Sequence, residues 1–289
     1  MARILGIGIA TLDIINSVDG YPAEDAEVRA LAQQRRRGGN CTNSLAVLAQ
    51  LGHRCAWGGV IADETDAQII LDDLTGRGIE LSAVRREARG KVPTSYVTLN
   101  RRNGSRTIIH YRDLPEFGYG DFAAIDLRPY DWLHFEGRNV ADTGRMLSYA
   151  HRLLPTVPRS VEIEKPRPDI EHLFDHAEVL LFSRHYAAAR GFRDPERFLA
   201  TLAGETPACR RILTWGEAGA YALEWDGRVC HSPAYPPPRV VDTLGAGDVF
   251  NAAIIDALVR GADLTAALTQ GCRLAGRKCG SEGLEVVRI

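Results

Sequence analysis

The stretch Asp242-Thr-Leu-Gly-Ala-Gly-Asp248 leads directly into an apolar segment of helical period, Val249–Arg260. Its small residues let the backbone approach a ligand closely and turn N–H groups outward, and the helix that follows adds the positive end of its dipole. The stretch therefore predicts a strand-to-helix turn that binds phosphate oxygens. Asp248 fits two roles there: a helix N-cap, or a base that takes a proton from an attacking hydroxyl.

The same pairing of strand and helix repeats along the chain of 289 residues. Short apolar runs predict buried strands at Ile4–Ile9, Cys55–Ile61, Trp132–Phe135, Ser160–Ile163, Val179–Phe182 and Arg211–Trp215. Segments of helical period predict helices at Asn40–Leu51, Asp66–Arg77, Ala141–Leu154, Asp194–Ala203, Val249–Arg260 and Leu264–Lys278. Alternating strands and helices indicate an α/β fold with a mainly parallel central sheet flanked by helices. We expect a single domain over residues 1–289.

Two stretches break this alternation. Glu27–Arg35 and Thr94–Tyr111 alternate apolar and polar residues, and Asn103-Gly104 is a strong hairpin turn signal. These strands suit a small second sheet that projects from the α/β body, inserted at about residues 11–37 and 93–113. Such a sheet would serve as a lid, a dimer interface, or both.

Composition excludes several classes of protein. The formal charge of −2, with 45% hydrophobic and 25% charged residues, excludes a disordered chain and argues against a general attraction to DNA or anionic membranes. The six cysteines form no Cys-x-x-Cys pair, which is typical of reduced cytosolic thiols. The apolar start of the chain ends at Asp13, and no window approaches the roughly 20 apolar residues of a membrane helix. We expect a cytoplasmic protein with no nucleic-acid or membrane partner.

A second polar segment, Arg35-Arg-Arg-Gly-Gly-Asn-Cys-Thr-Asn43, opens a predicted helix. Asn40 and Asn43 lie three residues apart on its first turn, where two carboxamides could exchange hydrogen bonds with the hydroxyls of a polyol. The alternative is that Asn40 is an N-cap and Asn43 is solvated. Asp13, placed by the pattern at the carboxyl end of the first strand, could accept from further hydroxyls.

Other nucleotide-binding motifs do not fit. The chain has no Gly-x-x-x-x-Gly-Lys-Ser/Thr sequence, so it is not a P-loop enzyme. Gly6-Ile-Gly-Ile-Ala-Thr11 follows a strand, but Thr11 stands at the third glycine of a dinucleotide fingerprint. A dinucleotide-dependent oxidoreductase is therefore a poor alternative.

Gly38-Gly-Asn40 near the start and Asp242–Asp248 near the end together resemble the PfkB, or ribokinase-like, carbohydrate kinases. The similarity runs from Ile4 to about Leu284 and is greatest to the ketohexokinase branch of that family. It is carried by Tyr21-Pro-Ala-Glu-Asp25, Asn103-Gly-Ser-Arg-Thr107, Glu136-Gly-Arg-Asn139, Glu162-Ile-Glu-Lys-Pro-Arg167, Pro236–Asp248 and Lys278-Cys-Gly280. The resemblance implies a ribokinase-like three-layer sandwich with a small β-sheet lid.

The resemblance also implies a reaction, the ATP-dependent phosphorylation of a ketohexose such as D-fructose to fructose 1-phosphate. Asp248 matches the family's general base, and the amides of Gly245, Ala246 and Gly247 match its anion hole. The positions that match sugar-binding residues are Asp13, Gly39, Asn40, Asn43 and Arg106, the last also reaching toward the phosphate. From the residues alone, Arg106 would be a surface cation beside a hairpin turn.

The nucleotide site follows from the same resemblance. Its matching positions are Trp215, Gly216, Glu217, Gly219, Pro236, Pro237, Gly245, Gly247, Cys272, Gly276 and Cys279. By spacing alone, core packing is the more usual explanation of Trp215, Cys272 and Cys279.

Family members use Mg²⁺ with ATP and often K⁺, to which Asp242 would be nearest. Many carry an Asn-x-x-Glu motif for Mg²⁺, but the corresponding Ser183-Arg-His-Tyr186 lacks both groups. Glu162 and Glu164 are candidates for water-mediated contacts to Mg²⁺, or else are solvated or paired with Lys165 and Arg167.

Family members form homodimers through the lid, and Asp25 matches a residue that enters the partner's sugar site. Two alternatives stay open: a kinase for another sugar or a nucleoside, and a catalytically weak sugar-binding regulator on the same fold. The intact Asp248 and its glycine-rich turn argue against the regulator.

Overall fold

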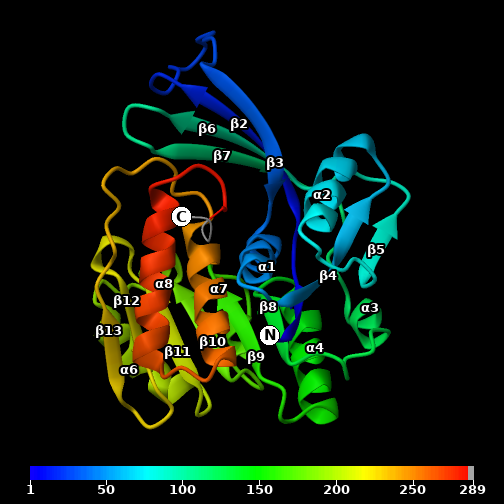
Figure 1. Ribbon diagram of the computed structural model, residues 1–289, viewed down its shortest axis with the longest axis vertical. Coiled ribbons are helices and arrows are strands. Elements are labelled where there is room, and N and C mark those ends of the chain that lie inside the picture. Colours follow the sequence, from blue (N-terminus) through cyan, green and yellow to red (C-terminus); the bar gives the residue numbers. More distant parts are fainter. Residues whose placement is uncertain (286–289) are drawn as a thin grey trace.

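The computed structural model describes residues 1–285 of the 289-residue chain (Figure 1). Its strands are β1 Arg3–Ile7, β2 Thr11–Val18, β3 Ala32–Gly38, β4 Arg54–Ala62, β5 Val84–Glu87, β6 Thr94–Asn100, β7 Arg106–Tyr111, β8 Trp132–Glu136, β9 Arg159–Ile163, β10 Val179–Ser183, β11 Arg210–Thr214, β12 Ala220–Leu223 and β13 Val229–Ser232. Its helices are α1 Asn40–Gln50, α2 Thr65–Gly76, α3 Tyr119–Ala123, α4 Val140–Leu153, α5 Arg184–Ala189, α6 Pro195–Glu205, α7 Ala246–Val259 and α8 Leu264–Cys279, with 3₁₀ turns η1 Ile170–Leu173 and η2 Gly216–Ala218.

Nine strands form one sheet in the order β13-β12-β11-β10-β9-β8-β1-β4-β5. The strands from β11 through β5 are parallel, and β12 near one edge pairs antiparallel with both β11 and the edge strand β13. The central strands are buried along almost their whole length on both faces, which is the pattern of a sheet covered by helices on each side. The predicted α/β fold with a mainly parallel sheet is confirmed.

The order of the strands decides which helices lie on which face. The chain steps in one direction from β8 to β11 through α4, η1, α5 and α6, and in the opposite direction from β1 to β4 through α1. Because crossovers between parallel strands are right-handed, α1 lies on the face opposite to α4–α6. Helix α7 packs against both α1 and α8, and α8 also contacts β12 and β13 (Figure 1). The first turns of α1 and α7 are thereby brought together at one end of the sheet.

Helix α7 lies between α1 and α8 and is buried on nearly all sides. Ten consecutive residues, Asp248 through Ala257, are buried. A helix in such a position needs an apolar circumference, and α7 has one except for a few polar side chains that face the site or form internal pairs. One of those pairs joins Asp256 to the buried ring of His53 at 2.8 Å.

A second sheet of four strands, ordered β3-β2-β6-β7, stands above the body as a lid (Figure 1). Its register places Asp13, Ser95 and His110 opposite one another in one row and Ile14, Tyr96 and Ile109 in the next. Since successive side chains of a strand point to opposite faces, the two rows lie on opposite faces of the lid. The polar face carries Asp13, Ser95, His110 and Arg106 beside Val97 and Ile108, and the apolar face carries Ile14, Tyr96 and Ile109 beside Thr98 and Thr107.

The predicted ends of two strands are wrong. Strand β3 begins at Ala32, and Glu27–Leu31 lies outside any strand, since alternation is also common in exposed loops. Strand β1 ends at Ile7, so Asp13 lies in lid strand β2 and not at the carboxyl end of the first sheet strand. Within residues 1–285 no helix is long and apolar enough to span a bilayer.

Candidate active site

A cavity of about 640 Å³ lies between the lid and the carboxyl ends of the sheet strands. Its lining includes the last residues of β8, β10 and β11, the first turns of α1 and α7, and the polar face of the lid. In doubly wound sheets this edge is where ligands bind. The predicted residues that line it are Asp13, Gly39, Asn40, Asn43, Arg106, Glu162, Glu164, Gly245, Ala246, Gly247 and Asp248.

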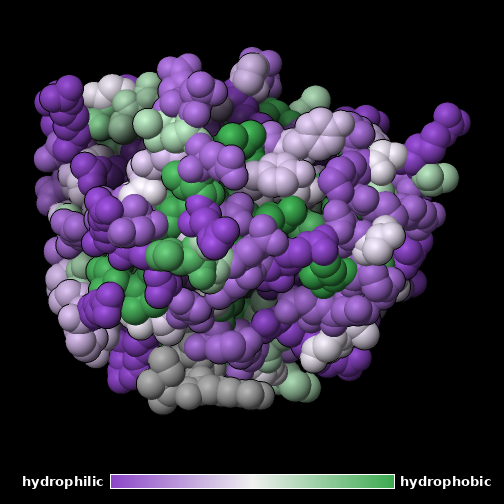
Figure 2. Space-filling model, turned by 90° about the horizontal axis from the view of Figure 1, so that it is seen from above, coloured by the Kyte–Doolittle hydropathy of each residue, from purple (hydrophilic) through white to green (hydrophobic). Residues whose placement is uncertain are grey.

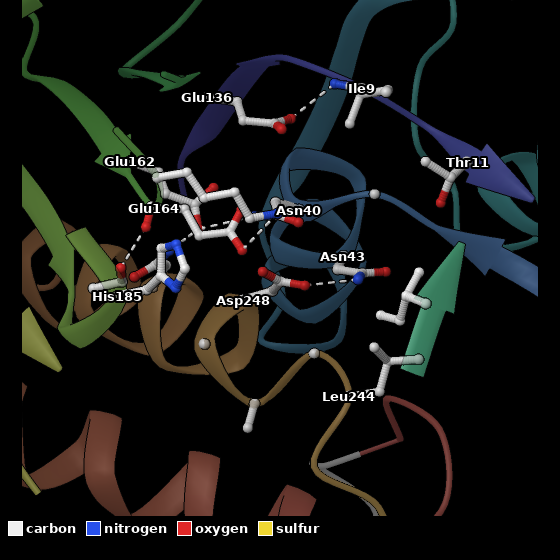
Figure 3. Close-up of a pocket in the computed structure, with 18 of the residues that line it drawn as sticks. Ile9, Thr11, Asn40, Asn43, Glu136, Glu162, Glu164, His185, Leu244 and Asp248 are labelled. Carbon is white, nitrogen blue, oxygen red and sulfur yellow. Dashed lines mark hydrogen bonds and ion pairs between the residues drawn. The ribbon is translucent and has the colours of Figure 1, made fainter. Parts of the chain in front are cut away.

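Asp248 lies in the first turn of α7 and is 7% exposed. The helix begins at Ala246, three residues earlier than predicted, because Gly245 takes the N-cap position at a left-handed φ of 84°. The alternative that Asp248 is the N-cap is therefore wrong. Its Oδ2 instead accepts a hydrogen bond of 2.7 Å from the Asn43 amide, and the two side chains point toward each other in Figure 3.

The environment of Asp248 makes its carboxylate a strong proton acceptor. Burial raises its pKa to about 8, the negative charges of Glu164 and Glu136 act in the same direction, and the hydrogen bond from Asn43 opposes them. A carboxyl group in this range can take up a proton near neutral pH, which is what a general base must do.

The turn before α7 offers backbone donors to the cavity. The N–H groups of Gly245 and Gly247 find no acceptor within residues 1–285, whereas that of Ala246 contacts the Thr243 carbonyl at 3.3 Å. The N–H of Leu244 is held by the Asp242 carboxylate at 2.8 Å. The predicted anion hole thus has two open donors, and the amide of Ala246 is partly engaged.

The two asparagines of α1 face the same cavity. Gly39 is the N-cap of α1 at a φ of 104°, where an added Cβ would lie 2.3 Å from the Ile9 carbonyl oxygen, so Asn40 is not the N-cap. The Asn40 amide donates to Glu162 and Glu164 at 3.3 and 3.0 Å. Asn43 is 8% exposed and not solvated. Both alternatives to sugar binding at these positions are wrong.

A wall of carboxylates stands opposite Asn40 (Figure 3). Burial raises the pKa of Glu162 well above its ordinary value, and the charges of Asp248, Glu136 and Glu164 add to this effect. One carboxylate oxygen of Glu162, Oε2, is buried without a hydrogen-bond partner. Glu136 accepts from the Ile9 N–H at 2.9 Å, and burial raises its pKa despite the nearby Arg138. The wall can bind a cation or protonated groups.

The lid closes the other side of the cavity. Asp13 is 7% exposed, and burial raises its pKa against the hydrogen bonds from Thr11 and Ser95. Arg106 donates from Nη1 to the Thr243 hydroxyl at 2.7 Å, which links lid strand β7 to the glycine-rich turn. Arg106 is exposed, as the surface-cation alternative expects, and its side chain also lines the cavity.

A buried base, open backbone donors at a helix N-terminus and polar groups for hydroxyls together suit the transfer of a phosphoryl group to an alcohol. A family model described as pfkB family carbohydrate kinase matches residues 1–286. The chain belongs to this family.

Individual relatives agree with this membership. Ketohexokinase of Mus musculus is 44% identical over 291 aligned positions that cover 98% of both chains. Ribokinase of Bacillus subtilis is 25% identical and covers 99% of this chain and 95% of its own. The predicted similarity to the ketohexokinase branch is confirmed by the first of these.

Solved ribokinase structures share the fold. The Arabidopsis thaliana enzyme, solved with ribose and ATP, superposes with a TM-score of 0.80 at 19% identity over 98% of this chain and 94% of its own. The Thermotoga maritima enzyme superposes with a TM-score of 0.79 at 20% identity over 98% and 95%. The predicted ribokinase-like fold is confirmed.

Apart from Gly245 and Gly247, the positions matched to the family's nucleotide site lie outside the cavity lining. Helix α8 packs against the loop that follows β13: an added Cβ on Gly276 would lie 1.8 Å from the Tyr235 carbonyl oxygen, and one on Gly280 would lie 2.9 Å from Pro237. Cys272 is buried and its thiol points to the Ser232 carbonyl at 3.6 Å. On the neighbouring turn, Arg184 stacks over the Trp215 ring at 5.5 Å.

The surface formed by residues 215–219, 233–239 and 272–280 adjoins the glycine-rich turn. The N–H of Val241 donates to the Cys279 carbonyl at 2.7 Å, so the segment leading to the turn runs along the end of α8. This surface is therefore continuous with the glycine-rich turn. Cys279 is half-buried and Cys272 is buried, so core packing accounts for Cys272 without a ligand.

The predicted cation-binding residue Asp242 and the predicted partner-site residue Asp25 also lie away from the cavity. Asp242 is ion-paired with Lys278 at 3.0 Å and with Arg36 at 3.2 Å, and these cations lower its pKa although burial alone would raise it. Asp25 lies in the exposed loop between β2 and β3 at a φ of 60° and does not line the cavity of its own chain.

Sequence reasoning missed several residues that line or support the site. Asn251, one turn after Asp248, donates to Glu162 at 3.1 Å, and its helical spacing from Asp248 could have revealed it. Glu136 lies in a motif that marked the family likeness but had no assigned role. Arg37 sits in a run of three arginines that resembles a solvated charge cluster, yet its side chain is only 2% exposed.

Proposed function

We propose that this carbohydrate kinase transfers the γ-phosphoryl group of ATP to a ketohexose, with D-fructose as substrate and fructose 1-phosphate as product. The ketohexose comes from the likeness to the mouse ketohexokinase and ATP from the solved relative that holds ATP and ribose. The observation that carries the proposal is the buried Asp248 carboxylate, which faces the cavity beside open amides at the start of α7.

In the proposed reaction Asp248 takes the proton of the sugar's primary hydroxyl as that oxygen attacks the γ-phosphorus. The bond between the γ-phosphorus and the bridging oxygen breaks, and ADP leaves. The Gly245 and Gly247 N–H groups, with the positive end of the α7 dipole, stabilise the charge on the transferred group. Arg106, held by Thr243 at the cavity wall, supplies a positive charge from the lid.

The sugar would lie between α1 and the lid. Asn40 directs its NH₂ at the carboxylates, which leaves its Oδ1 to accept from a sugar hydroxyl. Asp13 accepts from a second hydroxyl, and the burial of its carboxylate favours a ligand that satisfies it. Gly39 lets the start of α1 lie against the backbone of Ile9, because a side chain at position 39 would strike the Ile9 carbonyl oxygen.

Mg²⁺ is a further part of the proposal, and the donor set fits it. Carboxylate oxygens and phosphates are the ligands that Mg²⁺ prefers, and Glu162 presents a buried, unpartnered oxygen at the cavity. Glu162 and Glu164 would hold the ion through water, where it neutralises charge on the phosphates. Among residues 1–285 no three His, Cys, Asp or Glu side chains cluster as a metal cage, in keeping with an ion carried mainly by the nucleotide.

The donors around Asp242 do not fit K⁺. Its carboxylate already contacts Lys278, Arg36 and the Leu244 N–H, so the positive charge that a monovalent cation would bring is present in side chains. We derive no step from K⁺ at this position.

We also propose a homodimer formed through the lid of a single domain spanning residues 1–289. Figure 2 shows apolar side chains gathered on the upper face, over the lid. Ile109, Tyr96 and Tyr111 are 70%, 44% and 49% exposed there, which is costly unless another surface covers them. A second copy would also bring Asp25 of one chain to the sugar site of the other.

Cytoplasmic location is a proposal of the same kind. It is supported by six cysteines that are all free thiols, five of them buried.

The test of the function is a substrate panel. Ketoses and aldoses are incubated with ATP and Mg²⁺, and the phosphorylated position is read by phosphorus NMR. We expect fructose to be phosphorylated at C1 with the highest kcat/KM. Preference for ribose or a nucleoside would support the alternative kinase, and absence of turnover with intact sugar binding would support the regulator.

A further inference from the structure

Arg37 occupies an unusual place for an arginine of a lid strand. It ends β3 next to Gly38, and its side chain turns inward until only 2% of it is exposed. Burial lowers its pKa, yet a guanidinium stays charged at any physiological pH. A buried permanent charge is retained only where partners satisfy it, so the partners of Arg37 show its task.

Those partners form a continuous chain to the active site. The Nε of Arg37 donates to Asp73 of α2 at 2.5 Å, and its Nη1 donates to the Oδ1 of Asn43 at 2.8 Å. The Nδ2 of Asn43 in turn donates to Asp248 at 2.7 Å. The same Nη1 also bonds the Thr42 hydroxyl at 3.1 Å, and that hydroxyl donates to the Gly38 carbonyl at 2.9 Å. Arg37 is thereby fixed at both ends.

We propose that Arg37 is a positioning residue that sets the orientation of the Asn43 amide, so that Asn43 always presents its NH₂ group to Asp248. A carboxamide has one accepting and one donating end of nearly equal shape. With Arg37 donating to Oδ1, only the NH₂ end can face Asp248. Without Arg37, the amide could turn and place a carbonyl oxygen against a carboxylate, which would repel its ionised form.

The charge of Arg37 acts on Asp248 in the same direction as this hydrogen bond. Asp248 is otherwise faced by acidic groups: Glu136 at the end of β8, Glu162 of β9, and Glu164 just after it. Arg37 is the cation on the opposite side, and its charge lowers the pKa of Asp248. Arg37 of lid strand β3, held by Asp73 of α2, thus helps to keep Asp248 ionised although Asp248 lies on α7.

This inference rests on the proposed function, because it assigns a role relative to the base of the kinase reaction. The test compares Arg37→Met and Arg37→Lys with the parent protein, using the sugar that the parent phosphorylates and recording kcat/KM against pH. Met removes the charge and the donors. Lys keeps the charge but cannot bond Asp73 and Asn43 with one fixed fork. The matched control is Arg35→Met. Arg35 lies on the same strand as Arg37, and its replacement removes an exposed ion pair to Asp66 of α2.

We expect Arg37→Met to move the acidic limb of the profile upward by about one pH unit, as the loss of a nearby opposite charge does. At neutral pH its kcat/KM should fall about tenfold, with recovery at high pH where Asp248 is ionised again. Arg37→Lys should move the limb less. Arg35→Met should leave the profile unchanged. A loss that is equal at every pH would overturn the inference, because a merely structural defect behaves in that way.

A double-mutant cycle separates action through Asn43 from any other route, and it needs only the conservative variant if Arg37→Met fails to fold. In an Asn43→Ala background, Arg37→Lys should have little further effect on the limb or on kcat, because the residue through which it acts is gone. Additive losses would overturn the role. If the parent protein phosphorylates no ketose, the proposed function fails first; if it does and the cycle is additive, only the role of Arg37 fails.

Discussion

The amide of Asn43 donates to the carboxylate of Asp248 at 2.7 Å, although the two residues are 205 positions apart. The contact exists because α1 and α7 pack side by side with their first turns at the same end of the sheet. Under the proposed function it joins the helix that would face the sugar to the base of the reaction. Sugar binding and proton removal would then be linked at one hydrogen bond.

Replacing Asp248 with Asn tests the base directly. The substitution keeps the shape of the side chain but removes the proton acceptor, so kcat should fall by roughly 10²–10⁴-fold. The KM for the sugar should change little, because the cavity lining remains. Steady-state kinetics with fructose and ATP would measure both values.

Asp256→Asn is the matched control for that variant. Asp256 lies on the same helix and is also buried, but it pairs with His53, Arg260 and Gln270 away from the cavity. It should lower the free energy of unfolding and leave kcat near that of the parent. Near-parental turnover in Asp248→Asn would exclude the proposed mechanism.

A pH dependence follows from the raised pKa of Asp248, about 8. The active form is the ionised carboxylate, so kcat/KM should rise with pH and level off above about 8. Below that value the ionised fraction falls about tenfold for each pH unit, and the rate should fall with it. Initial rates between pH 6 and about 9.5 would show the limb. A flat profile down to pH 6 would contradict the assigned state of this carboxyl group.

Much of the central sheet could be predicted from the sequence, whereas the contacts of the site could not. Strands such as Val179–Ser183 begin with four consecutive apolar residues, and the neighbouring helices have clear spacing, so local pattern is enough. The glycine-rich turn also marked its helix, but it did not show that the helix starts at Ala246, because that start depends on the left-handed Gly245.

The contacts of the lid could not be predicted from local sequence, because they depend on how distant elements pack together. The run Arg35-Arg-Arg37 has the pattern of a solvated strand, and only the packing of α2 and α1 against β3 buries the third arginine. Ile14-Ile15 places one apolar side chain on each face of a strand, so the pattern does not tell which face is covered. The parallel pairing of β2 with β6 joins segments about eighty residues apart and leaves no local signal.

The buried Lys278 should be essential for stability. Its Nζ contacts the carboxylate of Asp242 at 3.0 Å and its carbonyl at 2.7 Å, and its side chain is fully buried. Lys278→Met would remove one of the two cations that pair with the buried Asp242 carboxylate and leave Arg36 as the other. Breaking a buried pair in this way costs about 3–5 kcal/mol, so the urea midpoint should fall sharply.

Lys91→Met is the control for the loss of a lysine ion pair. Lys91 bonds Glu64 and Asp66 on the surface with 32% of its side chain exposed. Its loss should cost less than about 1 kcal/mol. Equal effects of the two substitutions would mean that the tie between α8 and the glycine-rich turn contributes nothing beyond a surface pair.

The apolar face of the lid should mediate dimerisation. Ile109 is 70% exposed at the edge-strand end of the row that it forms with Tyr96 and Ile14. Ile109→Glu would place a charge in the proposed interface and should convert the dimer to a monomer in light scattering. Val229→Glu, at an exposed position on the edge strand β13, should leave the mass unchanged. A dimeric Ile109→Glu protein would place the interface elsewhere.

Asp25 provides the most specific test of a shared site. The residue has a left-handed φ of 60°, which Asn tolerates far better than Ala, so Asp25→Asn removes the charge with little backbone strain. If Asp25 serves the neighbouring subunit, a mixed dimer of Asp25→Asn and Asp248→Asn chains contains one site with both native residues. Co-expressed, differently tagged chains should then regain activity that neither homodimer has.

The same mixture distinguishes the opposite arrangement. If Asp25 serves its own chain, one site of the mixed dimer lacks Asp25 and the other lacks Asp248, so activity would equal the mean of the two homodimers. Adding Ile109→Glu to both chains provides the control, because recovery that depends on a dimer must disappear when the lid cannot pair. Recovery that survives this substitution would show that the chains complement each other through a different interface.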